Sequence, residues 1–381
     1  MLAHRTWSAR TCLLIVLALL VGVTPTRAGV TNPNISILGQ PFSRWTNDEN
    51  DPDVRRATLD VGETEVIYDD YLNPYAKGFF TISFGADDVE VEEGYFTLLR
   101  GLPAGLTLKG GKYRVGFGKL NPLHPHAVPF ADRPRVLAAY MPGDESFNET
   151  GVQLSGRLPS PGDVSINASA DWLKGDSFLI SRSPSGDPGD PLLSGGDDRA
   201  QESRPAGIGR LSAFIPIHDR SGLEIGFSGT QGTNNVAAGT RTTVLGGDVK
   251  LKLWTSASAY LLLQGEVMSL DRENAAWDST TQSYGSTSVK PFGGYVFADY
   301  NFGTRYNAGV SYEHFEEPTA TQAADQAFGA FAGLSLLEES TVFRLDWNHF
   351  MPGNGSATPD NIDTVTLRVI FSMGPHKAHQ F

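Results

Sequence analysis

Cysteine is almost missing from this sequence of 381 residues, and the single one, Cys12, lies in an N-terminal segment typical of a secretion signal. Two arginines precede an apolar run from Leu13 to Val23, and a small-residue cleavage site ends at Ala28. We expect residues 1–28 to be a signal peptide. The exported remainder then has no disulfide, so its stability must come from another source, such as a closed ladder of backbone hydrogen bonds.

Long apolar runs and positive charge are also scarce. Beyond residue 28 no stretch approaches the roughly 20 consecutive apolar residues that a membrane-spanning helix needs. The 30 Lys and Arg residues are outnumbered by 43 Asp and Glu, which gives a net charge of −13, and the basic residues form no stripe. The sequence therefore argues against a spanning helix in this part of the chain and against a nucleic-acid partner.

Between residues 31 and 373 the sequence instead contains segment after segment in which apolar and polar residues alternate. In the last segment, for example, Val365 and Leu367 alternate with Thr366 and Arg368. Segments of about ten residues with this period, joined by tight turns and by longer polar loops, are the signature of a transmembrane β-barrel. A barrel is also the only sheet that satisfies every backbone amide within lipid.

We predict an all-β fold in which residues 29–381 form a single transmembrane antiparallel β-barrel of about 16 strands, within a range of about 14 to 18. Short turns and both chain ends are expected on the periplasmic side, and long loops on the extracellular side. The predicted location is the bacterial outer membrane of a Gram-negative cell, with outer-membrane lipid around the barrel. A barrel of about this size leaves an aqueous channel rather than a filled core.

Charged residues of the strands are expected to line the channel. A basic side chain on the lipid face costs roughly 2–4 kcal/mol at mid-bilayer, so placement in the lumen is favoured. In the segment 106–118 we predict a β-bulge at Gly110-Gly111, which would leave Tyr113, Val115 and Phe117 on the lipid face. The predicted wall residues are Lys112, Arg114, Lys250, Lys252, Arg344, Asp346 and Arg368.

The third long connection, about residues 120–150, is unusual because it combines prolines and charges with apolar side chains such as Leu123 and Phe130. Apolar residues in a loop indicate that it packs against something. We expect this loop to fold into the barrel and to narrow the channel, where its charges would select solutes through their local field. The alternative is a loop packed under its neighbours with its charges in water. The predicted constriction residues are Asp132, Arg133, Arg135, Asp144 and Glu145.

The same loop carries His124 and His126, separated by one proline. Imidazole is a common zinc ligand, so these two residues are a candidate metal site and zinc is the one cofactor that the sequence suggests. A firm site needs further ligands, which Asp132 or a carboxylate from elsewhere in the chain would have to supply. The alternative is that neither histidine binds metal.

A resemblance to known proteins is visible in these residues. The motif Gly116-Phe117-Gly118-Lys119-Leu120-Asn121, followed by His124 and His126, resembles bacterial outer-membrane proteins labelled zinc-regulated outer-membrane receptors, as does the ending from Gly374 to Phe381. More loosely, residues 112–118 resemble the phosphate-selective porin family. The resemblance implies outer-membrane transport. The terminal Phe381 is similar to the signal by which the barrel-assembly machinery recognises its substrates.

We therefore expect a porin that allows passive diffusion of a small polar solute or ion, that is not an enzyme and that forms a homotrimer. One alternative is an uptake channel for zinc or another divalent metal, and another is a purely structural barrel. A third is an outer-membrane hydrolase, although no nucleophile motif supports it. The residues that would serve such a hydrolase are His314, His349, Glu313, Glu316 and Asp346.

Overall fold

The computed structural model describes residues 33–85, 88–143, 146–180, 202–218, 220–278, 280–336, 340–356 and 360–375. The chain divides into two units, Met1–Asn32 and Pro33–Phe381. The first unit, which includes the predicted signal peptide, lies outside the described residues. No helix within the described residues is long and apolar enough to cross a membrane.

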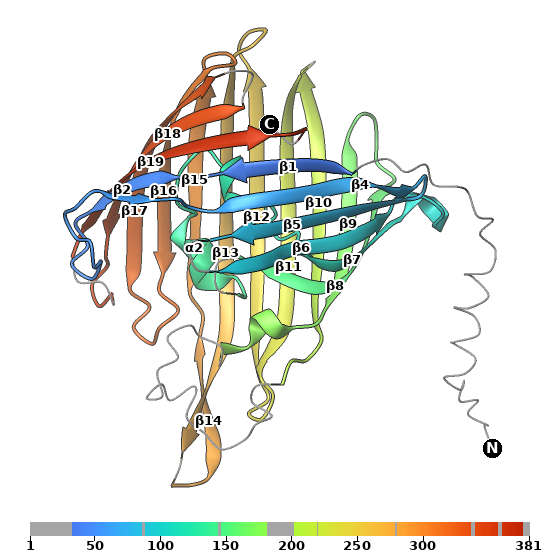
Figure 1. Ribbon diagram of the computed structural model, residues 1–381. Coiled ribbons are helices and arrows are strands. Elements are labelled where there is room, and N and C mark those ends of the chain that lie inside the picture. The colour runs from blue at the N-terminus through green and yellow to red at the C-terminus, as the bar shows by residue number, and fades with distance from the viewer. Residues whose placement is uncertain are drawn as a thin grey trace, which may run out of the picture. The chain divides into compact units, whose positions relative to one another are not determined.

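The second unit consists almost entirely of strands (Figure 1). They are β1 (Asn34–Gly39), β2 (Phe42–Thr46), β3 (Thr58–Asp60), β4 (Thr64–Asn73), β5 (Ala76–Phe84), β6 (Val89–Leu98), β7 (Thr107–Arg114), β8 (Asn148–Leu158), β9 (Ser165–Leu173), β10 (Ala206–His218), β11 (Ser221–Asn235), β12 (Thr240–Trp254), β13 (Tyr260–Asp278), β14 (Ser283–Val289), β15 (Phe292–Asn301), β16 (Tyr306–Glu316), β17 (Ala324–Leu336), β18 (Thr341–Met351) and β19 (Ile362–Met373). The helices are η1 (Pro103–Gly105), η2 (Pro125–Ala127), α2 (Arg135–Tyr140) and η3 (Asp176–Phe178).

Each strand pairs antiparallel with its neighbours in a single sheet. β1 pairs with β4 on one side and with β19 on the other, which closes the sheet into a barrel. β2 and β3 extend the wall beside β1 and β4, and β14 and β15 both pair with β13, so the described strands make a circumference of sixteen. The predicted fold class and strand number are confirmed.

The alternation of each strand sorts its side chains to two faces. On β13, Met268 is 1% exposed whereas its neighbour Val267 is 51% exposed. A belt of large exposed apolar side chains continues around the outside of the barrel. It includes Phe80, Val152, Leu211, Phe227, Leu245, Val296, Val310, Leu345 and Leu367. A closed barrel with this belt spans a lipid bilayer, and this architecture belongs to the bacterial outer membrane, as predicted.

The wall is uneven in height. β5 to β9 have 8 to 11 residues each, whereas β11 to β13 have 15 to 19. The hairpin of β13 and β14 extends well beyond its neighbours (Figure 1). Residues 231–243 and 271–291 are polar like loop residues, but most of both segments is strand. Their residues are polar on both faces, so the apolar half of the alternating pattern is missing there.

The predicted bulge in β7 is wrong, and the faces of this strand are reversed. β7 keeps a continuous register with β6 and β8 through Gly110 and Gly111. The register shift lies instead between β5 and β6, at the adjacent pair Glu92 and Glu93. Tyr113 therefore points to the buried side, where its hydroxyl donates to Asp171 Oδ2 at 2.9 Å.

Val115 and Phe117, which we expected within the same strand, follow its end at Arg114 and are fully buried in a loop. Lys112 and Arg114 lie on the face of β7 opposite Tyr113. Each is held in an ion pair with β6, Lys112 with Glu90 at 2.6 Å and Arg114 with Glu92 at 2.9 Å. Neither residue therefore stands as a free charge of the open wall.

Candidate functional site in the barrel interior

Residues 115–147, here called the crossing loop, connect β7 to β8 and pack against the far wall of the barrel, formed by β13, β15 and β16. Asn121 closes the neck of this loop. Its side-chain amide donates to the carbonyls of Val115 and Phe147 at 2.8 and 3.0 Å, and its oxygen accepts from the Phe147 amide at 2.9 Å. Asn121 is 1% exposed, so these bonds are shielded from water and hold the two ends of the loop together.

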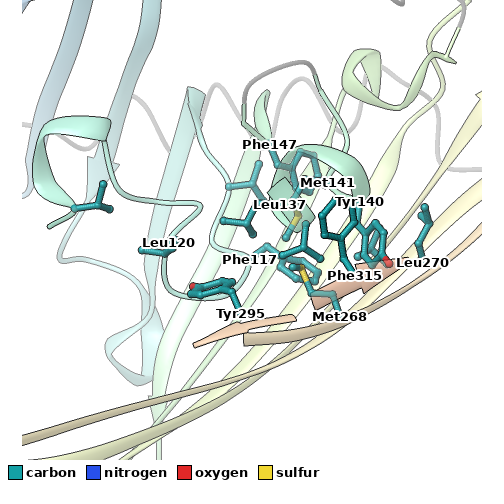
Figure 2. Close-up of a cluster of buried hydrophobic side chains, with 14 of the residues drawn as sticks. Phe117, Leu120, Leu137, Tyr140, Met141, Phe147, Met268, Leu270, Tyr295 and Phe315 are labelled. Carbon is teal, nitrogen blue, oxygen red and sulfur yellow. The ribbon is translucent and has the colours of Figure 1, made fainter. Parts of the chain in front are cut away.

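Apolar packing holds the body of the loop. Figure 2 shows Phe117 and Tyr140 of the loop beside Met268 and Phe315 of the wall, within one buried cluster. Phe130 meets the rings of Phe297 and Phe331 edge to face, at centroid distances of 5.2 and 5.7 Å. Burying large side chains of this kind stabilises by about 1.5–3 kcal/mol each, which explains why an apolar loop sequence is retained inside a polar lumen.

Two wall carboxylates bind backbone amides of the loop, and we call them the carboxylate anchors. Glu266 on β13 accepts from the amides of Lys119 and Leu120 at 2.7 and 2.9 Å, and from the Tyr295 hydroxyl at 2.6 Å. Gly118, with φ of +60°, makes this approach possible, because a Cβ there would overlap the Glu266 carboxylate.

The second carboxylate anchor is Glu313 on β16. Its two oxygens accept from the amides of Arg135 and Val136, both at 2.9 Å, at the start of α2. These amides have no partner within the helix, so the carboxylate satisfies donors that would otherwise be buried without a bond. At the other end of α2, the Tyr140 hydroxyl donates to the Glu316 carbonyl at 2.8 Å.

A different kind of contact holds residues 124–126, through a group of side chains that we call the acid–histidine cluster. His124 Nδ1 lies 3.3 Å from Glu65 Oε2 and 3.2 Å from Glu92 Oε2, and its Nε2 lies 2.8 Å from Glu93 Oε2. His126 Nδ1 lies 3.1 Å from Glu65 Oε1. Glu65 is on β4 and the other two glutamates are at the bulge of β6, so this cluster ties the loop to the near wall.

Burial and charge oppose each other at His124. Burial lowers the pKa of its imidazole, while the hydrogen bonds and charges of Glu65, Glu92 and Glu93 raise it, and the net result is a pKa well above the ordinary value. Glu65, Glu92 and Glu93 therefore favour a positive charge at the His124 ring. Glu65, His124 and His126 each offer a ligand atom within 4.8 Å of the others.

The predicted constriction residues Asp132, Arg133 and Arg135 come together around a cavity of about 220 Å³. The carboxylate of Asp132 lies 4.0 Å from the guanidinium of Arg44 on β2. Arg133 donates to the Leu123 carbonyl, and the guanidinium of Arg135 lies 4.0 Å above the ring of Phe350. Asp144 and Glu145, which we also predicted, lie outside the described residues.

The predicted wall residues on β12, β18 and β19 differ in the contacts that they make. Asp346 lines the same cavity and accepts a hydrogen bond from the Ala131 backbone. Arg344 is fully buried and stands opposite Arg368 in the register of β18 and β19. Lys250 and Lys252 lie opposite the exposed Val249 in the alternation of β12, and Lys252 Nζ is 4.0 Å from the Tyr260 ring centroid.

The histidines considered for a hydrolase face away from the interior. His349 stacks on Trp347, which is 42% exposed, and its Nδ1 lies 2.9 Å from Asp363. His314 follows the buried Glu313, so strand alternation turns its side chain outward. The partner of His349 is thus Asp363 and not Asp346, and His314 lies on the face of β16 opposite Glu313.

Sequence reasoning missed most of the residues that hold the crossing loop, namely Arg44, Glu65, Glu92, Glu93 and Glu266, and it considered Glu313 only for a hydrolase. One signal was available. The alternation Val89-Glu90-Val91-Glu92 breaks at Glu93, and two adjacent glutamates in a strand indicate a bulge. The other residues are single charged residues, far in sequence from the part of the loop that they contact.

No protein-family model matches the sequence. An uncharacterized protein of Aquifex aeolicus (strain VF5) is 29% identical over 254 residues, which are 63% of this chain and 51% of that protein. The chain thus spans about half the length of the curated relative that it matches. The predicted resemblance to zinc-regulated receptors receives no support from these comparisons and stays a prediction.

Solved structures resemble this fold over nearly its whole length. The anion-selective porin from Comamonas acidovorans has a TM-score of 0.58 at 10% identity, covering 90% of this chain and 100% of that one. The outer-membrane channel DcaP of Acinetobacter baumannii has a TM-score of 0.59 at 11% identity, covering 92% and 99%. Salmonella typhi OmpF, in a complex with daunomycin, has 0.55 at 10%, covering 90% and 97%. At these identities the likeness concerns the fold alone, a closed antiparallel β-barrel of the kind found in outer-membrane porins.

Proposed function

We propose that this protein is an outer-membrane porin for passive diffusion of small polar solutes or ions. The observation that carries the proposal is the cavity between the crossing loop and the wall, which Asp132, Arg135, Arg44 and Glu313 line with charges of both signs. Charges that face each other across a narrow passage act on a permeating solute through their local field. Such a passage needs no chemical step, and we propose no enzymatic role.

Planar-bilayer conductance of the purified protein tests this function. The expected result is a stepwise ion current with a defined single-channel size, because a barrel of about 16 strands contains water. Protein unfolded by heat before insertion is the matched control. A current no larger than that of the lipid alone, from protein shown to be folded and inserted, would refute the proposal.

The alternative of a zinc-uptake channel requires ligands that a passing ion can reach. His126 is 3% exposed and Glu65 is fully buried, so an ion bound there would be held rather than passed on. Zinc flux into vesicles that contain the protein, compared with flux of potassium, distinguishes the two. Equal permeation of both ions supports a general porin, and selective zinc flux would support the alternative.

We further propose a homotrimer. Strands such as β7, with 8 residues, rise only about 20 Å when tilted as in outer-membrane barrels, less than the apolar band of about 25 Å. A second copy of the chain, packed against these short strands, would shield them from lipid that is thicker than the strands are tall. Phe80, Phe96 and Val152 are exposed there and offer the apolar contact. The OmpT of Vibrio cholerae has been solved in a trimer form, with a TM-score of 0.51. Light scattering in detergent tests the trimer, and a monomeric mass would refute it.

The barrel-assembly machinery is the proposed partner during insertion. The terminal Phe381, on which this proposal rests, lies outside the described residues. Removal of Phe381 is expected to reduce the amount of folded protein in the outer membrane while leaving folding into detergent unchanged. Equal membrane levels of the two forms would argue against this partner.

A further inference from the structure

The acid–histidine cluster contains an unusual pair of buried atoms. Glu65 Oε2 and His124 Nδ1 lie 3.3 Å apart, and neither has a hydrogen-bond partner in good geometry. The other Glu65 oxygen is satisfied, because Gln40 donates to it at 3.1 Å. The Glu65 side chain is 0% exposed, so water does not solvate the unbonded oxygen. Buried polar atoms without partners are costly and point to a ligand that supplies the missing bond.

The distances fit a metal ion. Ligand bonds of about 2.0–2.1 Å in a tetrahedral zinc site place neighbouring ligand atoms about 3.3 Å apart. Here His124 Nδ1 lies 3.3 Å from Glu65 Oε2 and 3.2 Å from Glu92 Oε2, and His126 Nδ1 lies 3.1 Å from the Glu65 carboxylate. Two imidazoles and the Glu65 carboxylate therefore converge, each with one ligand atom within 4.8 Å of the others, and Glu92 lies at the edge of this group.

The charge of the cluster also favours a divalent cation. Glu65, Glu92 and Glu93 face one guanidinium, that of Arg114, and Glu63 shares a hydrogen bond with Glu92. The carboxylates of the cluster therefore outnumber its guanidinium, in a place that is largely buried. Buried negative charge needs compensation, and a divalent cation supplies it.

A contact outside the proposed ligand set orients the His124 ring. His124 Nε2 lies 2.8 Å from Glu93 Oε2, so the ring can donate its proton there and direct Nδ1 into the cluster. An imidazole held by a carboxylate on one nitrogen and by metal on the other is the usual arrangement around zinc. Imidazole and carboxylate together suit zinc and its transition-metal neighbours, whereas magnesium and calcium prefer oxygen alone.

We propose that Glu65, His124 and His126 bind a zinc-class divalent cation that ties the crossing loop to β4, while Glu93 holds the His124 ring to β6. The carboxylate anchors hold the loop to the far wall, and the metal holds it to the near wall. The site is structural, and its existence does not depend on whether the barrel conducts ions. A zinc titration can therefore fail while the conductance test succeeds, and the reverse.

The test is a zinc titration of the full mature protein in detergent, after removal of metal with a chelator. The double variant His376→Ala/His379→Ala serves as the background, because it removes the other histidine pair of the sequence. In that background we expect one tight zinc ion per chain, a higher thermal unfolding temperature with zinc, and the visible absorption of tetrahedral cobalt when cobalt replaces zinc. Magnesium serves as the control for simple attraction to carboxylates. We expect it neither to bind tightly nor to raise the unfolding temperature.

Three variants of the proposed site and one control variant test which residues bind zinc. Glu65→Gln and His124→Ala should lower zinc affinity by about 100-fold or more, and Glu93→Gln, which alters only the orienting contact, by about 10-fold. His349→Ala removes a histidine that pairs with Asp363 on the outer side of β18 and should leave affinity unchanged. Each variant is checked for the thermal transition of a folded barrel without metal, so that misfolding is recognised. Zinc affinity that survives both Glu65→Gln and His124→Ala, or equal competition by magnesium, would overturn the site.

Discussion

The crossing loop is held in two ways, and the contrast lies in which part of the loop makes the contact. At the carboxylate anchors, Glu266 and Glu313 bind backbone amides, so the wall supplies the chemistry and the loop supplies only its shape. At the acid–histidine cluster, wall carboxylates bind the side chains of His124 and His126, so the identity of the loop residues matters. The first kind of contact tolerates sequence change in the loop, and the second does not.

The two kinds of contact also differ in the atoms that they bring together. The carboxylates at the anchors accept bonds of 2.7–2.9 Å from amides that need a partner, and a bond to a charged group contributes about 1.5–3 kcal/mol. An unbonded buried oxygen occurs in both, at Glu266 Oε2 and at Glu65 Oε2, but within the described residues only the cluster gathers two histidines and a carboxylate at ligand distance. The anchors thus hold the loop through bonds to the protein, whereas the proposed cation completes the cluster. Permanent narrowing of the channel can rest on the anchors even without metal.

The largest effect is expected when an anchor is removed. Glu266→Ala leaves the amides of Lys119 and Leu120 buried without an acceptor, a loss of about 3 kcal/mol or more. Hydrogen exchange of these amides should rise by about 100-fold, and single-channel current should become larger and noisier as the loop detaches. Glu202→Gln, in an exposed loop, is the control. Unchanged exchange and current in Glu266→Ala would show that apolar packing alone holds the loop.

Glu313→Ala should have a similar but smaller effect, because Tyr140 still bonds to the Glu316 carbonyl at the other end of α2. We expect a loss of about 2 kcal/mol in docking of the helix, seen as faster exchange of the Arg135 and Val136 amides. Glu313→Gln keeps one acceptor and should lie between the variant and the wild type. If Glu313→Gln behaves like Glu313→Ala, the charge of the carboxylate and not its geometry is what the helix needs.

A hydrogen bond between two residues of the wall serves as a comparison for the anchors of the crossing loop. Tyr113→Phe removes the hydroxyl that donates to Asp171, while Gln153 still donates to the same carboxylate at 3.0 Å. The urea midpoint of the barrel should fall by an amount that corresponds to about 1 kcal/mol, with single-channel noise unchanged. Noise that rises with this variant would mean that the wall and the crossing loop do not respond separately.

The difference between these contacts also explains what could be predicted from the sequence. Alternation over whole segments is a local property, so most strands and the closed barrel were predicted correctly. The end of β7 was not, because Val115 and Phe117 alternate like strand residues although they lie buried in the loop. The contacts of Glu266 and Glu313 with the loop were missed because each is a lone acid that meets a backbone amide more than a hundred positions away.

The proposed metal site shows the same limit of sequence analysis, because only part of its ligand set could be recognised. His124 and His126 were recognised from their own chemistry, but their ligand partner Glu65 lies on β4, about 60 positions earlier. Nothing local marks Glu65 as different from other acids of the strands. Side chains that act through their own identity can be recognised in a sequence, whereas their partners become visible only when the register of the barrel is known.

The smallest effect on stability, and the most specific effect on transport, is expected at the cavity. Arg44 and Asp132 are both about two-fifths exposed and 4.0 Å apart, so breaking this pair should change stability by less than about 1 kcal/mol. Their charges nevertheless face the same passage with opposite sign. Arg44→Ala should therefore shift the reversal potential across a salt gradient toward cations, and Asp132→Asn toward anions, with Glu202→Gln as a control without effect. Shifts of the same sign in both variants would place the passage elsewhere in the barrel, because removing opposite charges from one constriction cannot favour the same ion.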